Sequence, residues 1–459
     1  MDYLNFLQSK QISVQRKGFE PCSINPALFD WQAKCTEFAV KRGTAALFED
    51  CGLGKTAQQL EWARQVHEHT GKPVLILAPL AVSAQTKREG EKFGIDVHIA
   101  RGQEDVINGI NIANYEILQK FDTGIFSGVV LDESSILKSY MGKTKRMIVD
   151  SFKNTPYRLA CSATPAPNDL MELLNHAEFL GVMRSSEALS VWFIADQSQS
   201  GKYRLKGHAE KDFWEWVASW AICMEKPSDI GYSDEGYILS PLHVIDKIIP
   251  TEYTDAWGLP AIIDMSIKGF HAEKARTSQI RAEKCAEIAM SVPAEQIVIW
   301  CDTNDEADRL RALLPDAIEI RGSDKPEKKE QAAIDFCAGN IRVLISKPSI
   351  FGYGLNFQNC SNTIFCGLDY SFESYYQAVR RFHRFGQTKP VNVYRVLGST
   401  ENNILQAIER KAAQKEHMQR SMAAAMKTAQ IRNLHGKQFK ISECIMDQIN
   451  LPCWIRSAV

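Results

Sequence analysis

The sequence has no pair of cysteines at the spacing C-x-x-C and no cluster of cysteines and histidines at the spacing of a zinc site. Its twelve cysteines are scattered, and several lie in apolar runs, as buried thiols do in a reducing cytoplasm. No run approaches the roughly twenty apolar residues of a membrane-spanning helix. The first ten residues lack the basic and apolar regions of a signal peptide. These absences argue against a disulfide scaffold and a zinc module, and they predict a cytoplasmic protein.

The chain also has almost no net charge, because 54 Lys and Arg oppose 55 Asp and Glu to give −1. No bulk field therefore draws the protein to a polyanion, and any nucleic-acid binding must come from local patches. Residues 401–459 are a predicted helical segment with nine basic and five acidic residues. Such a segment is more often a solvated face than a nucleic-acid contact. The length of 459 residues and the hydrophobic content of 45% fit a protein of several globular domains.

What the sequence does contain is organised around residues 52–56, GLGKT. The small apolar residues 44–48 predict a buried strand before this segment, and residues 57–66 after it have helical spacing. A strand, a glycine-rich loop and a helix in this order are typical of a phosphate-binding loop. Lys55 would reach the β- and γ-phosphates, and the Thr56 hydroxyl would bind Mg²⁺. The alternative is a glycine-rich surface turn that precedes a lysine by coincidence.

Apolar runs at residues 73–78, 127–131 and 157–161 alternate with helical patterns. This alternation indicates a parallel sheet with helices on both faces, in which functional residues lie at the carboxyl ends of strands. Asp132 and Glu133 follow the second run at such an end. We predict that Asp132 binds Mg²⁺ and that Glu133 activates or positions the attacking water. An acidic turn at a strand end is the alternative, which the phosphate-binding loop upstream disfavours.

A second α/β block begins near residue 273, and it contains Arg381 and Arg384 but no phosphate-binding loop. We predict a helix around residues 374–385, on which a spacing of three places both arginines on one face. Guanidinium groups bind phosphate oxygens in a forked geometry, so two of them across a cleft suit stabilisation of a transferring γ-phosphate. The sequence therefore predicts a two-lobe ATPase with ATP at the interface between the lobes.

Between the two blocks, residues 181–255 are rich in aromatic residues mixed with basic ones. We interpret this segment as a small helical insertion whose tryptophans form its core, and base stacking is the less favoured alternative. The predicted organisation is a lead-in, a first α/β lobe, the insertion with a linker, a second α/β lobe and a helical basic tail. The corresponding boundaries are 1–27, 28–180, 181–272, 273–400 and 401–459.

The order of these motifs over about residues 28–410 resembles that of the superfamily-two helicase-like ATPases, and within them the Swi/Snf-type translocases of double-stranded DNA. Gln32 lies where this family has an adenine-reading glutamine, and residues 52–56 are similar to its nucleotide-binding motif I. Residues 377–387, QAVRRFHRFGQ, are similar to motif VI and are the most specific match. The other matching segments are Ala78-Pro79-Leu80, Asn114-Tyr115-Glu116, Asp132-Glu133, Ser162-Ala163-Thr164, residues 164–173 and residues 352–356.

The resemblance implies two RecA-like lobes with ATP and Mg²⁺ between them. It assigns nucleotide binding to Gln32, Gly52, Leu53, Gly54, Lys55, Thr56, Asp132, Gly354, Asn356 and Gln377. It assigns the metal to Thr56 and Asp132, and catalysis to Glu133, Lys55, Arg381 and Arg384. The implied activity is hydrolysis of ATP to move along the phosphate backbone of double-stranded DNA, with little sequence specificity. The chain looks like a minimal motor of the kind found in phage or bacterial genomes, which implies a prokaryotic or phage-infected cytosol.

The sequence departs from the family pattern after Glu133, where Ser134 and Ser135 replace the usual Ala-His or Gly-His. Ser135 stands in place of a histidine that helps link hydrolysis to the second lobe. Cys51 stands where methionine is usual.

Two rival functions fit the same motifs. One is a strand-separating helicase or an RNA-directed ATPase, which would act on single-stranded DNA or RNA. The other is an ATP-controlled switch that binds DNA and recruits a protein partner with little movement. Fast turnover stimulated by DNA favours the motor, and slow, weakly stimulated turnover favours the switch.

Overall fold

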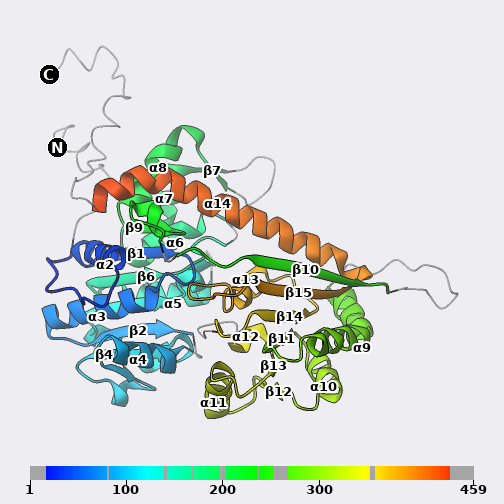
Figure 1. Ribbon diagram of the computed structural model, residues 1–459. Coiled ribbons are helices and arrows are strands. Elements are labelled where there is room, and N and C mark those ends of the chain that lie inside the picture. Colours follow the sequence, from blue (N-terminus) through cyan, green and yellow to red (C-terminus); the bar gives the residue numbers. More distant parts are fainter. Residues whose placement is uncertain are drawn as a thin grey trace, which may run out of the picture.

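The computed structural model describes residues 17–79, 82–138, 142–167, 169–195, 203–235, 237–251, 267–351 and 357–434. These residues form two α/β lobes that lie side by side, with one long helix running across both (Figure 1). The predicted α/β class with two parallel-sheet lobes and a C-terminal helix is thereby confirmed. Within these residues, no helix combines the length and the apolar character needed to cross a bilayer.

The first lobe is built on a seven-stranded sheet of order β3-β4-β2-β5-β6-β1-β9, in which every pair of neighbours is parallel. Its strands are β1 (Thr44–Glu49), β2 (Val74–Ala78), β3 (Val97–Ile99), β4 (Ile110–Asn114), β5 (Gly128–Asp132), β6 (Tyr157–Cys161) and β9 (Ala221–Met224). Its helices include α2 (Asp30–Arg42), α3 (Lys55–Thr70), α4 (Ser83–Lys92), α5 (Lys143–Phe152) and α6 (Glu172–Leu180).

The continuous apolar character of these strands follows from burial on both faces. Every residue of β1 and β2 is buried. Along β1, Ala45 and Leu47 pack into one core, while Ala46 and Phe48 pack into the core on the opposite face. Side chains alternate across a strand, so a strand between two helical layers needs an apolar residue at nearly every position.

The segment expected to be a helical insertion contributes to both sheets. It contains α7 (Ser185–Trp192), a small hairpin of β7 (Phe193–Ala195) and β8 (Tyr203–Leu205), and α8 (Glu210–Ala218). It then supplies β9 to the edge of the first sheet and β10 (Leu242–Ile249) to the edge of the second. Trp192, Trp214, Trp216 and Trp220 are buried, as favoured over base stacking, but they pack into the first lobe's core instead of a separate core of the insertion.

The second lobe is built on a six-stranded parallel sheet of order β10-β15-β14-β11-β13-β12. Its other strands are β11 (Ile297–Cys301), β12 (Ile318–Glu319), β13 (Val343–Ser346), β14 (Asn362–Cys366) and β15 (Val391–Gly398). Its helices are α9 (Ile267–Ser291), α10 (Asn304–Leu313), α11 (Pro326–Cys337), α12 (Pro348–Phe351) and α13 (Phe372–Val379).

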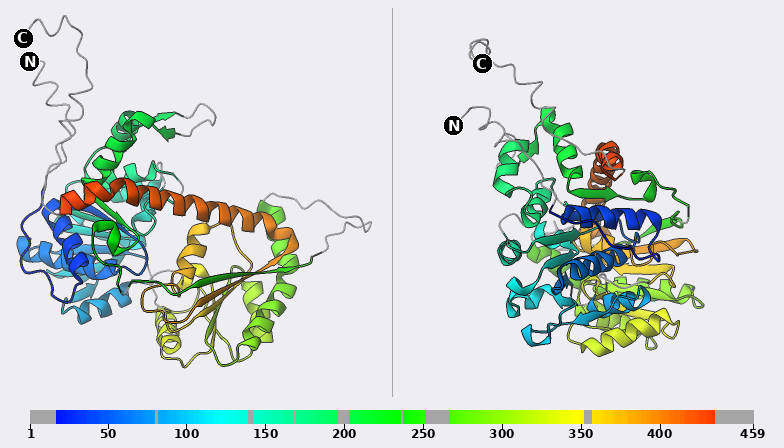
Figure 2. Two further views of the ribbon diagram at one scale, coloured as in Figure 1. Left: turned by 45° about the horizontal axis from the view of Figure 1, so that its top comes forward. Right: turned by 90° about the vertical axis from the view of Figure 1, so that its left-hand side faces the viewer.

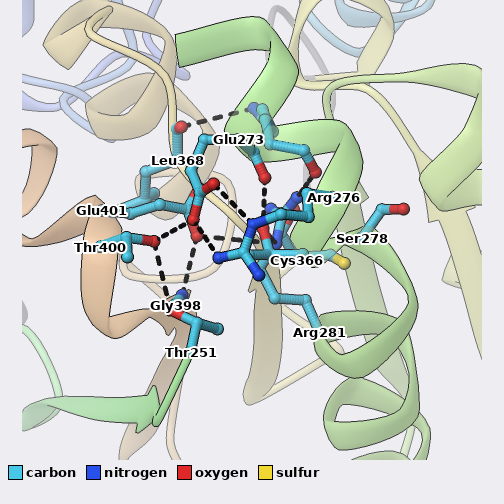
Figure 3. A network of polar contacts seen from close by, with 12 residues as sticks. Thr251, Glu273, Arg276, Ser278, Arg281, Cys366, Leu368, Gly398, Thr400 and Glu401 are labelled. Atoms are coloured by element: carbon cyan, nitrogen blue, oxygen red, sulfur yellow. Dashed lines mark hydrogen bonds and ion pairs between the residues drawn. The ribbon is translucent and has the colours of Figure 1, made fainter. Parts of the chain in front are cut away.

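A buried polar network fixes the ends of the second lobe's strands (Figure 3). Arg281 of α9 is fully buried and pairs with Glu306 at 2.9 Å and with Glu401 at 3.6 Å. Its guanidinium also donates to the carbonyl oxygen of Cys366 at 3.2 Å. Gly367 has φ +82°, and a Cβ there would lie 1.8 Å from Arg281 Nη1, so only glycine fits. The network therefore joins α9 to β14 through Cys366, to α10 through Glu306, and to the residues just before Asn402 through Glu401.

The long helix α14 (Asn402–Leu434) connects the two lobes physically (Figure 2). Near its start, Ile404 and Ile408 belong to the second lobe's core. Farther along, Met422 and Met426 are buried in the first lobe's core. The predicted helix is present over residues 402–434, and residues 435–459 of the predicted segment lie outside the described residues. Side chains along much of the helix are buried against protein, rather than forming a wholly solvated basic face.

Candidate nucleotide site between the lobes

The loop after β1 forms one wall of a cleft between the lobes. Gly52 and Gly54 have φ of +89° and +74°, the left-handed region that favours glycine, and α3 begins directly afterwards at Lys55. A Cβ built on Gly52 would lie 3.3 Å from the backbone N of Phe385 in the other lobe. The first glycine is therefore required both by its conformation and by the close approach of the second lobe.

Residues from both lobes line this cleft. The first lobe supplies Cys51, Gly52, Gly54, Lys55, Thr56, Asp132 and Glu133, together with Val82, Gln85 and Thr86 near the start of α4. The second lobe supplies Arg380, Arg381 and Arg384. Lys55 Nζ donates to the carbonyl oxygens of Glu49 at 2.7 Å and Asp50 at 3.1 Å, which hold the ammonium over the loop. The structure thus gathers the predicted phosphate-binding loop, acidic pair and arginines around one space.

The acidic pair lies at the carboxyl end of β5. Gln59 donates to Asp132 Oδ1 at 2.8 Å, and the Tyr115 hydroxyl donates to the Asp132 carbonyl oxygen at 2.7 Å. Glu133 has φ +55°, and among the described residues it is the one non-glycine residue with positive φ. A left-handed glutamate is costly, and such backbone strain is concentrated at functional sites. The left-handed backbone sets the direction in which the side chain of Glu133 leaves the chain.

Burial and charge give Glu133 the properties of a base that works near neutral pH. Burial and, to a smaller extent, the charge of the neighbouring Asp132 raise its pKa to about 7, against the opposing charge of Lys55. Burial also raises the pKa of Asp132. Glu133 Oε2 is buried and has no hydrogen-bond partner within the described part of the chain. A carboxylate with a pKa near the working pH and a free oxygen is suited to accept a proton from water.

The arginines reach the cleft by a different route from the predicted one. Helix α13 ends at Val379 instead of continuing to residue 385, so Arg381 and Arg384 do not share a helical face. Residues beyond Val379 form turns that bury Phe382 fully in the second lobe's core and reach Gly386, which has φ +88°. The prediction of a helical face was wrong, although both arginines line the cleft.

Arg384 has an excess of positive charge around it. Burial lowers its pKa to about 10, and the nearby charge of Arg381 acts in the same direction. Its guanidinium makes no ion pair with any residue that the structure describes, whereas Arg381 Nε donates to the Gln377 carbonyl oxygen at 3.2 Å. A half-buried guanidinium beside a second one is stabilised by an anion in the cleft. This environment fits the predicted role of Arg384 toward a phosphate.

Sequence reasoning missed Arg380, a third cleft arginine. Arg380 forms an ion pair with Asp50 of the first lobe and donates to the Cys51 carbonyl oxygen at 3.0 Å. The Tyr376 hydroxyl donates to the same carboxylate at 2.7 Å. Removing one member of a buried ion pair typically costs about 3–5 kcal/mol. The only signal in the sequence was the opposite charge of two residues in separate motifs, which does not indicate a contact.

A second contact between the lobes involves Ser135, at the position of the family's histidine. The Ser135 hydroxyl donates to Glu373 Oε1 at 3.1 Å, and Lys138 pairs with Glu373 Oε2 at 2.6 Å. Ser134 instead meets a histidine from α6, because His176 Nε2 lies 3.1 Å from its hydroxyl oxygen. Burial lowers the pKa of His176 to about 4, so this ring is neutral. Motif II therefore contacts the second lobe through a serine.

The remaining predicted binding residues do not line the cleft. Gln32 is buried behind the loop, where its Nε2 donates to the Leu53 carbonyl oxygen at 2.9 Å and its Oε1 accepts from the Phe29 N–H. Gln377 is also buried. The roles of Gln32, Leu53 and Gln377 toward the nucleotide stay predictions. Gly354 and Asn356 lie outside the described residues.

The cleft has oxygen donors that suit Mg²⁺. Thr56 and Asp132 both line it, and a hydroxyl with a carboxylate is a hard donor set of the kind this ion prefers. Across the described ranges, no group of three or more His, Cys, Asp or Glu residues forms a metal site. Mg²⁺ is commonly held by one or two protein oxygens together with substrate phosphates, so the residues present fit a metal that arrives with a nucleotide.

Two protein-family models match the sequence. The model described as SNF2-related domain matches residues 30–205, and the model described as helicase conserved C-terminal domain matches residues 281–386. The first match contains the phosphate-binding loop and the acidic pair, and the second contains all three cleft arginines.

Several curated proteins are similar over part of this chain. The TATA-binding protein-associated factor mot1 of Schizosaccharomyces pombe is 34% identical over 25% of this chain and 6% of its own length. The ATP-dependent helicase fft1 of the same organism is 30% identical over 34% of this chain and 17% of its own length. The chromatin-remodeling ATPase INO80 of Neurospora crassa is 35% identical over 22% of this chain and 5% of its own length. The chain therefore spans only a small part of these relatives.

Among solved structures, the Sulfolobus solfataricus SWI2/SNF2 ATPase core in complex with dsDNA is similar with a TM-score of 0.42 and 16% sequence identity. The superposition covers 91% of this chain and 98% of that one.

Proposed function

We propose that this chain, which belongs to the superfamily-two helicase-like ATPases of the Swi/Snf type, hydrolyses ATP to move along double-stranded DNA. The observation that carries the proposal is the cleft, in which Lys55 and Glu133 of one lobe face Arg384 of the other. A phosphate-binding loop alone would serve many functions. A catalytic site divided between two lobes makes hydrolysis depend on their relative position, which a motor requires.

In this mechanism the first lobe binds the nucleotide and prepares the water. The backbone N–H groups of the loop and the Lys55 ammonium bind the phosphates. Thr56 and Asp132 would hold Mg²⁺, which neutralises phosphate charge when it is bound. Glu133 Oε2, which is buried without a partner, accepts the proton of the attacking water.

The second lobe completes the site from across the cleft. Arg384 and Arg381 stabilise the negative charge on the γ-phosphoryl oxygens in the transition state. Loss of the γ-phosphate removes the anion that offsets their charge, so the closed arrangement becomes less favourable after each turnover. The contacts of Asp50 with Arg380 and of Ser135 with Glu373 are then made or broken as the lobes close and open.

The proposed track is duplex DNA, contacted mainly through phosphates, because the Swi/Snf-type family membership favours a duplex and the motifs include no base-reading element. The chain's net charge of −1 implies that local groups make these contacts. If the protein is a strand-separating helicase or an RNA-directed ATPase, single-stranded DNA or RNA should stimulate ATP hydrolysis more than duplex DNA does. If it is a binding switch, ATP hydrolysis should not displace a third strand from duplex DNA.

The test measures ATP hydrolysis without polymer and with double-stranded DNA, single-stranded DNA or RNA of equal length. The proposal expects the largest stimulation by duplex DNA, together with ATP-dependent displacement of a third strand from a triplex. Lys55→Ala is the matched negative control for both assays. Stimulation by single-stranded DNA or RNA alone, or stimulation without triplex displacement, would overturn the duplex motor in favour of one of the rivals.

A further inference from the structure

The helix α14 crosses both lobes (Figure 2), and it contacts segments near the cleft as well as the two lobe cores. Lys415 and Gln419 are four residues apart on α14, so they lie on one face of it. Gln419 Nε2 donates to the Ala163 carbonyl oxygen of the predicted motif III at 2.9 Å. Lys415 Nζ lies 3.0 Å from the centroid of the Tyr376 ring on α13. One face of α14 therefore contacts motif-bearing segments of both lobes.

Lys415 is unusual because its ammonium is buried without a hydrogen-bond acceptor. The residue is 4% exposed, and Nζ has no hydrogen-bond partner within the described ranges. Burial lowers its pKa to about 8, while the charge of Asp50 acts in the opposite direction. A cation over an aromatic ring recovers only part of the cost of removing an ammonium from water. An apolar side chain would serve packing at this position better, so stability alone does not account for the lysine.

A continuous set of contacts leads from Lys415 to the phosphate-binding loop. The ammonium contacts the Tyr376 ring, whose hydroxyl donates to Asp50 Oδ1 at 2.7 Å. The other carboxylate oxygen of Asp50 pairs with Arg380, which also donates to Cys51. Although burial would raise the pKa of Asp50, the charges of Arg380 and Lys415 keep it below its usual range. Lys415 is therefore the second cation that stabilises this carboxylate.

We propose that Lys415 is a positioning residue for ATP hydrolysis: by fixing Tyr376 and Asp50, it holds Arg380 and the turn that carries the other two arginines against the phosphate-binding loop. The helix α14 is thereby part of the catalytic assembly as well as a link between lobe cores. This inference rests on the proposed function for its turnover readout, but its effect on the cleft is measurable without turnover.

The first test compares Lys415→Met, Lys415→Arg and the matched control Lys427→Met, which replaces an exposed lysine on the same helix. Lys415→Met is expected to lower kcat with duplex DNA about tenfold, with the KM for ATP changed less than about twofold. Its melting temperature should change little, because the relief from burying an ammonium offsets the loss of its attraction to Asp50. Lys415→Arg should restore most of kcat, and Lys427→Met should match the wild type.

The second test measures backbone hydrogen exchange of the same proteins without nucleotide or DNA. Lys415→Met should speed exchange at residues 50–56 and 372–384, while exchange in strands β11 and β13 stays unchanged. Lys427→Met should leave all four segments unchanged.

The outcomes of the two tests are distinguishable. Wild-type protein without ATPase activity would reject the proposed function, whereas the exchange pattern would still support or reject the link from Lys415 to the loop. Wild-type kcat and wild-type exchange in Lys415→Met would overturn the inference. A lowered melting temperature that accounts for the lost activity, without recovery in Lys415→Arg, would also overturn it by showing a purely structural role.

Discussion

If Glu133 is the base, ATP hydrolysis should depend steeply on pH around neutrality. Its pKa of about 7 means that the carboxylate is about 9% ionised at pH 6 and about 91% ionised at pH 8. Only the ionised form accepts a proton from water. We therefore expect kcat/KM for ATP to rise about tenfold between pH 6 and pH 8 and to level off above that range.

A variant of the second lobe assigns this titration to the protein. The charge of Glu373 helps to raise the pKa of Glu133, after the larger effects of burial and Asp132. Glu373→Gln removes that charge, so the midpoint of the kcat/KM profile should shift to lower pH. Protonation of ATP itself would give the same midpoint in both proteins. Initial rates across the pH series, with far-ultraviolet circular dichroism to verify folding at each pH, provide the measurement.

Linkage gives the same carboxyl an opposite effect on stability. Folding raises the pKa of Glu133 above its ordinary value of 4.5, so its contribution to stability is fully present below that value. The contribution is lost as pH rises through about 7. Glu133→Gln should therefore be more stable than the wild type at pH 8, with a smaller difference at pH 5. A flat activity profile in folded wild-type protein, or a Glu133→Gln variant that is destabilised at pH 8, would refute the reasoning.

Three further predictions concern the loop, the second lobe and the track. Lys55→Ala should abolish detectable turnover with little change in melting temperature, and wild-type ATPase activity in this variant would contradict the site. Arg384→Ala should lower DNA-stimulated kcat by about 10²-fold or more while ATP affinity, measured by titration calorimetry, stays nearly intact. If Arg384→Ala melts at a much lower temperature but hydrolyses ATP normally while folded, the role of Arg384 is to stabilise the fold. Duplex affinity, measured by fluorescence anisotropy, should fall steeply between low and moderate salt, and a flat dependence would exclude phosphate contacts.

Much of the first lobe could be predicted from sequence because strands buried on both faces leave a strong apolar signal. Residues 73–78 and 157–161 are the clearest cases, and β2 and β6 lie there. Because functional residues of parallel sheets lie at the carboxyl ends of strands, the sequence also predicted that Asp132 and Glu133 lie beside the loop. The edge strand β9 was missed because it has only four residues and follows a tryptophan-rich helix directly. So short an apolar run cannot be distinguished from a continuation of the buried face of that helix.

The contacts between the lobes could not be predicted, because they depend on pairs of residues far apart in the chain. Asp50 and Arg380 are separated by 330 positions, and neither charge is unusual in its own segment. The end of α13 was misjudged for a related reason. Local spacing favoured a continued helix through Arg384, but the chain leaves the helix after Val379 and places Phe382 in the second lobe's core, a contact with residues distant in sequence.

The position of α14 also has a consequence for how this chain acquires its structure. The first lobe's core includes Met422 and Met426, and the backbone N–H of Cys223 on the edge strand β9 donates to Gln430 Oε1 at 2.7 Å. The lobe that is synthesised first therefore remains incomplete until residues about two hundred positions later have been made. The same helix is anchored in the second lobe, so melting of either core exposes apolar surface of the other. Despite their separate sheets, the two lobes should gain and lose structure together, as one cooperative unit.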